Sequence, residues 1–187
     1  HGDRWCPHPR RARRLIPSMF AAVHLPQFAL QSALRPTPEL QPSAVVLVDP
    51  AATTPRVIDL TAAASAQGAT VGLTPTQALA RCRELVVRHR SLSQESSTTE
   101  AALQIAHAFS PNIENSAPGL ITLDLRGLAD ATDPNTAPGW AARLRTAIER
   151  LSVRARIGIG PTPGVARHAA RWTDSVQVVT DARAFIG

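Results

Sequence analysis

Residues 114–127 read Glu-Asn-Ser-Ala-Pro-Gly-Leu-Ile-Thr-Leu-Asp-Leu-Arg-Gly, and this stretch constrains the fold more than any other part of the chain. Pro118-Gly119 is a turn signal, and residues 120–125 carry the apolar pattern of a half-buried strand. Helical patterns lie on both sides of the stretch. It therefore predicts a hairpin whose second strand lies inside a mixed sheet.

The order of elements around this hairpin predicts the fold class. A strand is predicted at 19–25, a helix that begins with a capping box at Ser97-Thr98-Thr99-Glu100, a helix at 138–151 and a strand at 153–159. Together with the hairpin they give β-α-β-β-α-β, the order of the ferredoxin-like fold, so we expect an α+β protein. Residues 28–91 are then an insertion between the first strand and the first helix, and 19–27 with 92–187 form the main unit.

Composition indicates an ordinary globular chain. Hydrophobic residues make up 44% and charged residues 18% of the 187 positions. No apolar run approaches the ~20 residues that span a bilayer, so no membrane segment is predicted. All 20 basic residues are arginine, and the formal net charge is +6. Arginine binds phosphate bidentately and keeps its charge, which suits a nucleic-acid partner.

Much of this charge lies in residues 1–18, which hold five arginines and one aspartate. The chain's one methionine, Met19, directly precedes the first predicted strand. Residues 1–18 are therefore interpreted as a basic arm or as a non-native upstream segment. Their histidines, aspartate and cysteine match no zinc spacing, so neither a metal site nor a cofactor is predicted. Cys82 falls in a helical apolar pattern and is predicted to be a buried thiol in a reducing cytoplasm.

Several short motifs follow one another along the chain. They are Val23-His24-Leu25, Gly72-Leu73-Thr74, Cys82-Arg83-Glu84-Leu85, Phe109-Ser110-Pro111, Ile157-Gly158-Ile159 and Val165-Ala166-Arg167. In this order they resemble Y-family (UmuC/DinB-type) translesion DNA polymerases, over roughly residues 19–180. The resemblance implies that the main unit is a polymerase palm and that residues 28–91 are a small fingers subdomain.

The positions that carry chemistry in this family hold other residues here. The resemblance places the metal-binding carboxylates at Pro26, Phe28, Gly119 and Leu120, none of which has a side-chain oxygen. Hard divalent cations need oxygen ligands. The triphosphate-binding tyrosine and arginine of the fingers fall on Ala62 and Ser65, and the aromatic steric gate falls on Gln31. The chain contains no tyrosine.

This pattern is similar to the ImuB-type branch of the family, inactive homologues that act as adaptors in damage-induced (SOS) mutagenesis. That resemblance implies an adaptor without catalysis that binds DNA, weakly in this stretch of chain. It also implies an error-prone C-family polymerase, a RecA-like accessory protein and the sliding clamp as partners. These contacts are expected mainly through regions beyond residue 187.

Two other interpretations remain open. In the first, the chain is an active, magnesium-dependent Y-family polymerase whose carboxylates are among Asp49, Asp59, Asp124 and Asp130, although turn aspartates are common without any such role. In the second, it is a ferredoxin-like interaction domain with no DNA role, because this fold serves many functions.

The candidates for DNA contact are the arginines on or near the closing strand and helix. They are Arg154, Arg156, Arg167 and Arg171. The alternative is a solvated charged surface. Trp140 and Trp172 lie in helical patterns and are predicted to be core anchors rather than base-stacking platforms.

Overall fold

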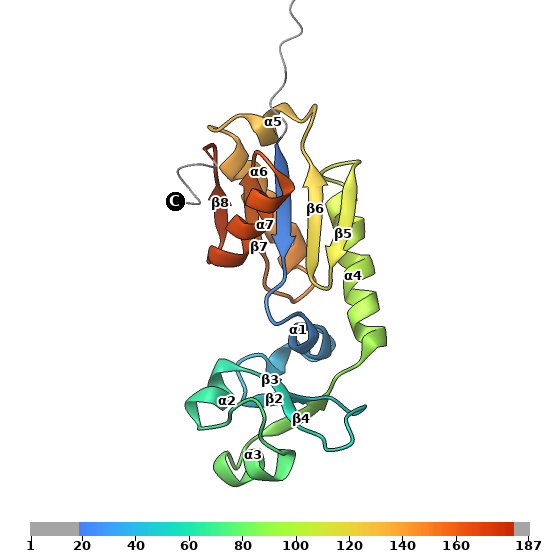
Figure 1. Ribbon diagram of the computed structural model, residues 1–187, viewed down its shortest axis with the longest axis vertical. Coiled ribbons are helices and arrows are strands. Elements are labelled where there is room, and N and C mark those ends of the chain that lie inside the picture. The colour runs from blue at the N-terminus through green and yellow to red at the C-terminus, as the bar shows by residue number, and fades with distance from the viewer. Residues whose placement is uncertain (1–18, 182–187) are drawn as a thin grey trace, which may run out of the picture.

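The computed structural model describes residues 19–181, which form two β-sheets and the helices around them (Figure 1). The strands are β1 (Phe20–His24), β2 (Val45–Val48), β3 (Val57–Leu60), β4 (Val86–His89), β5 (Ile113–Ala117), β6 (Leu120–Asp124), β7 (Arg156–Gly160) and β8 (Val176–Val178). The helices are α1 (Phe28–Leu34), α2 (Ala62–Ala66), α3 (Pro75–Arg81), α4 (Leu92–His107), α5 (Ala129–Thr132), α6 (Ala137–Glu149) and α7 (Pro163–Trp172), with a 3-10 turn at Pro38–Leu40. The basic segment 1–18 lies outside the described residues.

The larger sheet has the strand order β5-β6-β1-β7-β8. β1 is antiparallel to both β6 and β7, and β8 is parallel to β7. The β5–β6 hairpin turns at Pro118-Gly119, where Gly119 has a φ of +69°. Four of these strands with α4 and α6 give the ferredoxin-like order, with β8 as an addition, so the predicted α+β fold is confirmed.

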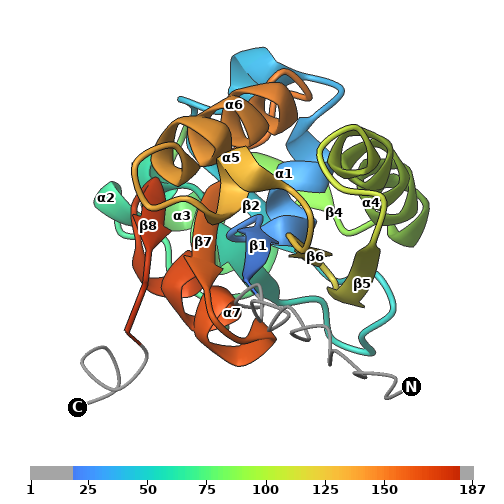
Figure 2. The same ribbon diagram turned by 90° about the horizontal axis from the view of Figure 1, so that it is seen from above.

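Helices cover the larger sheet on both faces (Figure 2). α4 and α6 lie on one face, where Val23, Ile121 and Ile157 pack with Leu144 in the main core. α7 lies on the other face, over the small side chains of Ala22 and its neighbours. The alternation of the strands explains this division, since successive side chains point to opposite faces.

The smaller sheet has the order β3-β2-β4 and lies at the far end of the molecule (Figure 1). Its central strand β2 is buried at all four positions, which explains its continuous apolar run. α3 begins with a capping box, in which the side chains of Thr74 and Gln77 each accept a hydrogen bond from the other's backbone N–H. Cys82 is buried in the same core, as predicted.

Two sequence predictions were wrong. α4 begins at Leu92, not at the predicted capping box of residues 97–100, and Ser91 caps it. The hydroxyls of Thr98 and Thr99 donate to carbonyls one turn back, at 2.9 Å each, so these residues lie inside the helix. Trp172 is 76% exposed rather than buried, whereas Trp140 packs edge-on against Phe109 in the core.

The residues that face the sheet from α7 explain the exposure of Trp172. Val165, Ala166, Ala169 and Ala170 form the buried stripe, and Trp172 lies outside that stripe. No helix within residues 19–181 is long and apolar enough to cross a membrane.

Gly158 of β7 sets how closely α7 approaches the sheet. A Cβ at this position would collide with the backbone of Ala166 and Ala170 and lie 2.8 Å from the Cβ of Ala169. The strand therefore requires glycine because another backbone comes so close, and not because of its own φ.

We predict that Gly158→Ala lowers the free energy of unfolding by about 1–3 kcal/mol, since α7 must shift away from the sheet. The matched control is Gly139→Ala in α6, where an added Cβ meets nothing within 4 Å. Alanine there should be neutral or stabilise by up to about 1 kcal/mol. Urea unfolding of both variants measures the difference, and equal stabilities would contradict the packing argument.

Candidate functional site at the junction of the two sheets

The carboxyl end of β1 and the β5–β6 turn meet at one end of the strands of the larger sheet. His24 pairs with Leu120 in the strand register, and the backbone N–H of Leu25 donates to the carbonyl of Gly119 at 2.8 Å. The structure therefore brings together the two segments that contain the four carboxylate positions of the polymerase resemblance.

An apolar contact fills the space between these segments. A Cβ at Gly119 would lie 2.7 Å from the Cβ of Phe28 and 3.0 Å from the carbonyl oxygen of Leu25. Leu120 is buried and packs beneath Ala166 and Ala170 of α7. No side-chain oxygen comes from these positions, and there is no room for one at Gly119. The residues present do not fit a divalent cation.

The four aspartates of the alternative interpretation do not converge. Asp124 pairs with Arg126 at 2.5 Å, and this hydrogen-bonded guanidinium lowers the pKa of the carboxyl. The Asp59 carboxylate accepts from Gln27, the Asp49 carboxylate accepts from the backbone of a neighbouring turn residue, and Asp130 is exposed. Across residues 19–181, no three His, Cys, Asp or Glu side chains gather closely enough to hold a metal ion.

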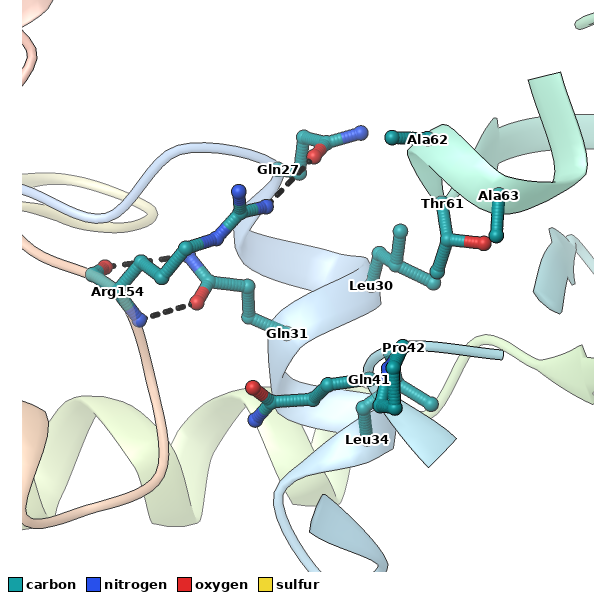
Figure 3. Close-up of a pocket in the computed structure, with 10 residues that line it drawn as sticks. All are labelled: Gln27, Leu30, Gln31, Leu34, Gln41, Pro42, Thr61, Ala62, Ala63 and Arg154. Carbon is teal, nitrogen blue, oxygen red and sulfur yellow. Dashed lines mark hydrogen bonds between the residues drawn. The ribbon is translucent and has the colours of Figure 1, made fainter. Parts of the chain in front are cut away.

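A cavity of ≈ 480 Å³ lies beside this end of the larger sheet, between α1 and the smaller sheet (Figure 3). Apolar side chains such as Leu30, Leu34 and Pro42 form much of its wall, and none of the ten residues that line it is acidic. Gln31 and Ala62, two of the predicted nucleotide positions, line this cavity. Ser65, the third, lines an adjoining cavity that shares Gln27, Thr61 and Ala62 with the first. The structure thus brings the three positions to one region.

The amide of Gln31 is fully used by the backbone. Its nitrogen donates to the carbonyls of Pro26 at 2.5 Å and Arg154 at 3.2 Å, and its oxygen accepts from the Arg154 N–H at 2.5 Å. Gln31 is only 7% exposed, so these bonds also satisfy an amide that would be costly to bury alone. They fix the start of α1 to the segment that leads into β7.

Gln27 extends this link to the smaller sheet. Its nitrogen donates to the Asp59 carboxylate at 2.7 Å and to the Leu60 carbonyl at 3.0 Å, and its oxygen accepts from the Arg154 guanidinium at 3.1 Å (Figure 3). Gln27 has a φ of 49°, which is uncommon for a residue other than glycine. Sequence reasoning missed this residue, and its partners are too distant along the chain for any local pattern to reveal them.

Among the described residues that line the cavity, there are binding groups but none placed for acid–base or nucleophilic chemistry. The hydroxyl of Thr61 donates to the Ser43 carbonyl at 2.8 Å and accepts from the Val45 N–H at 3.0 Å. The arrangement can therefore fix the two sheets relative to each other or accept an uncharged or anionic group beside Arg154.

The four predicted DNA-contact arginines divide into two locations. Arg154 borders the cavity, whereas Arg156, Arg167 and Arg171 lie on the α7 side of the larger sheet. Arg156 donates to the carbonyl of Arg171 at 3.2 Å. The Arg167 side chain donates to the hydroxyl of Thr122 at 3.0 Å and lies 3.5 Å from the Glu114 carboxylate, which offsets its charge.

His24 is a second residue that sequence reasoning did not assign to the site. Its Nδ1 is buried and has no hydrogen-bond partner among residues 19–181. Burial lowers the pKa of its imidazole, and the nearby charges of Arg156 and Arg171 lower it further. The neutral ring is therefore the form that the folded protein favours.

Comparisons with known proteins agree on one class. The model of the impB/mucB/samB family (IMS) matches residues 23–171. Among solved structures, an insertion ternary complex of Dbh DNA polymerase has a TM-score of 0.73 at 13% identity, covering 87% of this chain and 48% of that one. DinB from Sulfolobus solfataricus has a TM-score of 0.71 at 13% identity, with 86% and 48% covered.

A Y-family polymerase chimera of Dbh and Dpo4 has a TM-score of 0.74 at 14% identity, covering 89% of this chain and 51% of its own. The chain thus spans about half the length of the solved structures that it matches. A search among curated protein sequences found no match. At these identities, the structural likeness shows the palm fold of Y-family polymerases.

We predict that Gly119→Asp destabilises the protein more than Gly127→Asp does. Both glycines have positive φ, +69° and +83°, but an added Cβ meets nothing within 4 Å at Gly127. The difference therefore isolates the clash with Phe28 from backbone strain. We expect it to be about 1–3 kcal/mol in urea unfolding, and an equal loss in both variants would contradict a filled carboxylate position.

The lowered pKa of His24 predicts a loss of stability in acid. Because the unfolded chain takes up this proton first, near the ordinary value of 6.5, stability falls as pH drops from there toward the lower folded pKa. His24→Gln should show a smaller loss between about pH 8 and pH 5. His107→Gln, at an exposed histidine of α4, is the control. Unfolding curves across this range measure the slopes, and an unchanged slope in His24→Gln would exclude the buried neutral ring as its source.

Proposed function

The chain belongs to the impB/mucB/samB family, and from this membership we propose that it is a non-catalytic Y-family polymerase homologue that acts as an adaptor in translesion DNA synthesis. In this proposal it resembles the ImuB-type branch. It binds DNA and recruits an error-prone polymerase during damage-induced mutagenesis.

The contact between Phe28 and Gly119 is the observation that carries the proposal. Two-metal phosphoryl transfer needs carboxylates that hold two cations about 4 Å apart. Here the segments that would supply them lie side by side, joined by the Leu25–Gly119 backbone bond, yet an aromatic ring fills the space. The scaffold of a polymerase site is retained, and its ligand positions support packing instead.

The junction cavity supports the same proposal. Gln31 is at the position of the aromatic steric gate, and its amide is hydrogen-bonded to the backbone of Pro26 and Arg154. The alanine at position 62 offers no donor to a triphosphate. The expected metal ligands and the expected triphosphate ligands are missing from separate segments of the chain. A single cause, the absence of nucleotidyl transfer, would explain both.

We further propose partners for the whole protein. An adaptor of this class would bring a C-family polymerase, a RecA-like accessory protein and the sliding clamp to a lesion in the cytoplasm. Because the chain spans about half the length of its structural relatives, these contacts are assigned to no residue here. Family membership weighs against a ferredoxin-like domain without a DNA role.

Primer extension by the full-length protein tests the absence of catalysis. We expect no incorporation with magnesium or with manganese on an undamaged or a lesion-bearing template, because the ligand positions hold no oxygen. The active-polymerase alternative predicts incorporation instead.

A matched variant separates true activity from a contaminating polymerase. Any incorporation by this chain would have to use the remaining candidate carboxylates. It should therefore vanish in a variant that combines Asp49→Asn, Asp59→Asn, Asp124→Asn and Asp130→Asn. Incorporation that this variant abolishes would overturn the proposal. Incorporation that persists unchanged in the variant comes from another protein and leaves the absence of catalysis supported.

A further inference from the structure

The outer face of α7 carries an exposed aromatic pair. Trp172 is 76% exposed, and its ring lies 6.0 Å from that of His168, one turn earlier, at an angle of 43°. An indole usually buries much of its large apolar surface. The small residues that α7 presents to Gly158 leave Trp172 on the opposite side, where nothing within residues 19–181 covers it.

Two arginines lie beside this pair. Arg171 is exposed and, among residues 19–181, forms no ion pair. Arg156 lies beside it, since its guanidinium donates to the Arg171 carbonyl at 3.2 Å. Asp174 approaches Arg156 at 3.6 Å but is itself fully exposed, so solvent weakens this pair. α7 contains no acidic residue.

The position of the pair connects it to the junction site. Trp172 ends α7 close to the start of β7, and Arg156 pairs in register with His24 at the end of β1. This is the end of the sheet at which Leu25 meets Gly119. α7 lies on the face of the sheet opposite α4 and α6 (Figure 2). This face therefore offers an aromatic ring and two cations near the Leu25–Gly119 contact.

We infer that the outer face of α7 binds single-stranded DNA, with Trp172 stacking on an unpaired base and Arg171 and Arg156 contacting phosphates. This inference rests on the DNA role in the proposed function and adds the form of DNA and the residues. Aromatic side chains between arginines form the stacking platforms of proteins that bind single strands. A duplex keeps its bases stacked on each other and cannot offer one to Trp172.

The composition of the face favours DNA over a protein partner. Tryptophan and arginine occur at both kinds of interface, but the buried centre of a protein interface also contains apolar neighbours. On α7 the exposed neighbours of Trp172 are histidine and arginine, and its aliphatic residue Val165 faces the sheet. The exposed Leu92, Val71 and Leu79 belong to other elements.

Titration with oligo(dT) of about 12 nucleotides tests the inference through tryptophan fluorescence. A Trp5→Phe background leaves the buried Trp140 and the exposed Trp172 as emitters. Binding should quench the emission, and the affinity should fall with salt by a slope of about −0.7 for each phosphate contacted.

Substitutions at Trp172 separate stacking from simple hydrophobic contact. A polarisation assay with labelled oligo(dT) should show about 5- to 150-fold weaker binding for Trp172→Leu, whereas Trp172→Phe keeps most of the affinity. Equal binding by the two variants, or equal competition by a duplex, would overturn the inference.

Arginine variants test the phosphate contacts. Arg171→Ala should weaken binding and reduce the salt slope by about 0.7, while Arg143→Ala, at an exposed arginine of α6 on the other face, should change neither. Equal effects of the two variants would show that DNA is attracted by the overall positive charge and not bound at α7, and would overturn the inference. These results are independent of primer extension, so failure here leaves the absence of catalysis standing.

Discussion

The close approach of Phe28 to the turn at Gly119 fixes how the two sheets meet. The turn can come so near because Gly119 has no side chain and adopts a positive φ. The Leu25 N–H then reaches the Gly119 carbonyl, and the chain leaves β1 through the left-handed residue Gln27 into α1. The direction of α1 places Gln31 against the backbone of Arg154. This contact and the hydrogen bonds of Gln31 together hold α1, which lines the cavity.

Much of the fold follows from local signals in the sequence. Pro118-Gly119 marks the hairpin, and Thr74 with Gln77 marks the start of α3, because turns and capping boxes depend on neighbours along the chain. The start of α4 was misread for the same reason. Ser97 to Glu100 has the composition of a cap, but hydroxyls inside a helix can bond carbonyls one turn back, and only the preceding turn decides between the two.

The sequence indicated the candidate positions, whose role stays a prediction, but it did not indicate their contacts. Motif order alone aligned Pro26, Gly119 and Gln31 with family positions, and the structure brings their segments together. The bonds from Gln31 to Arg154 and from Gln27 to Asp59 join residues 123 and 32 positions apart. Amides have no charge pattern that reveals a partner at such separation. The prediction that Trp172 is buried was wrong, because a helical pattern does not show which side of the helix packs against the sheet.

These features have a common physical logic under the proposed function. Carboxylates grouped to hold cations repel one another when the cations are absent, so such a site costs stability. Once catalysis is not required, an aromatic ring and a close-packed turn can occupy the same space and stabilise the junction. The fold still presents α7 on the outside, with Trp172 and Arg171 open to solvent. In this proposal, a protein that does not transfer nucleotides can keep a surface for DNA. The packing of Phe28 against Gly119, at the expected metal positions, lies behind α7 and not on its outer face.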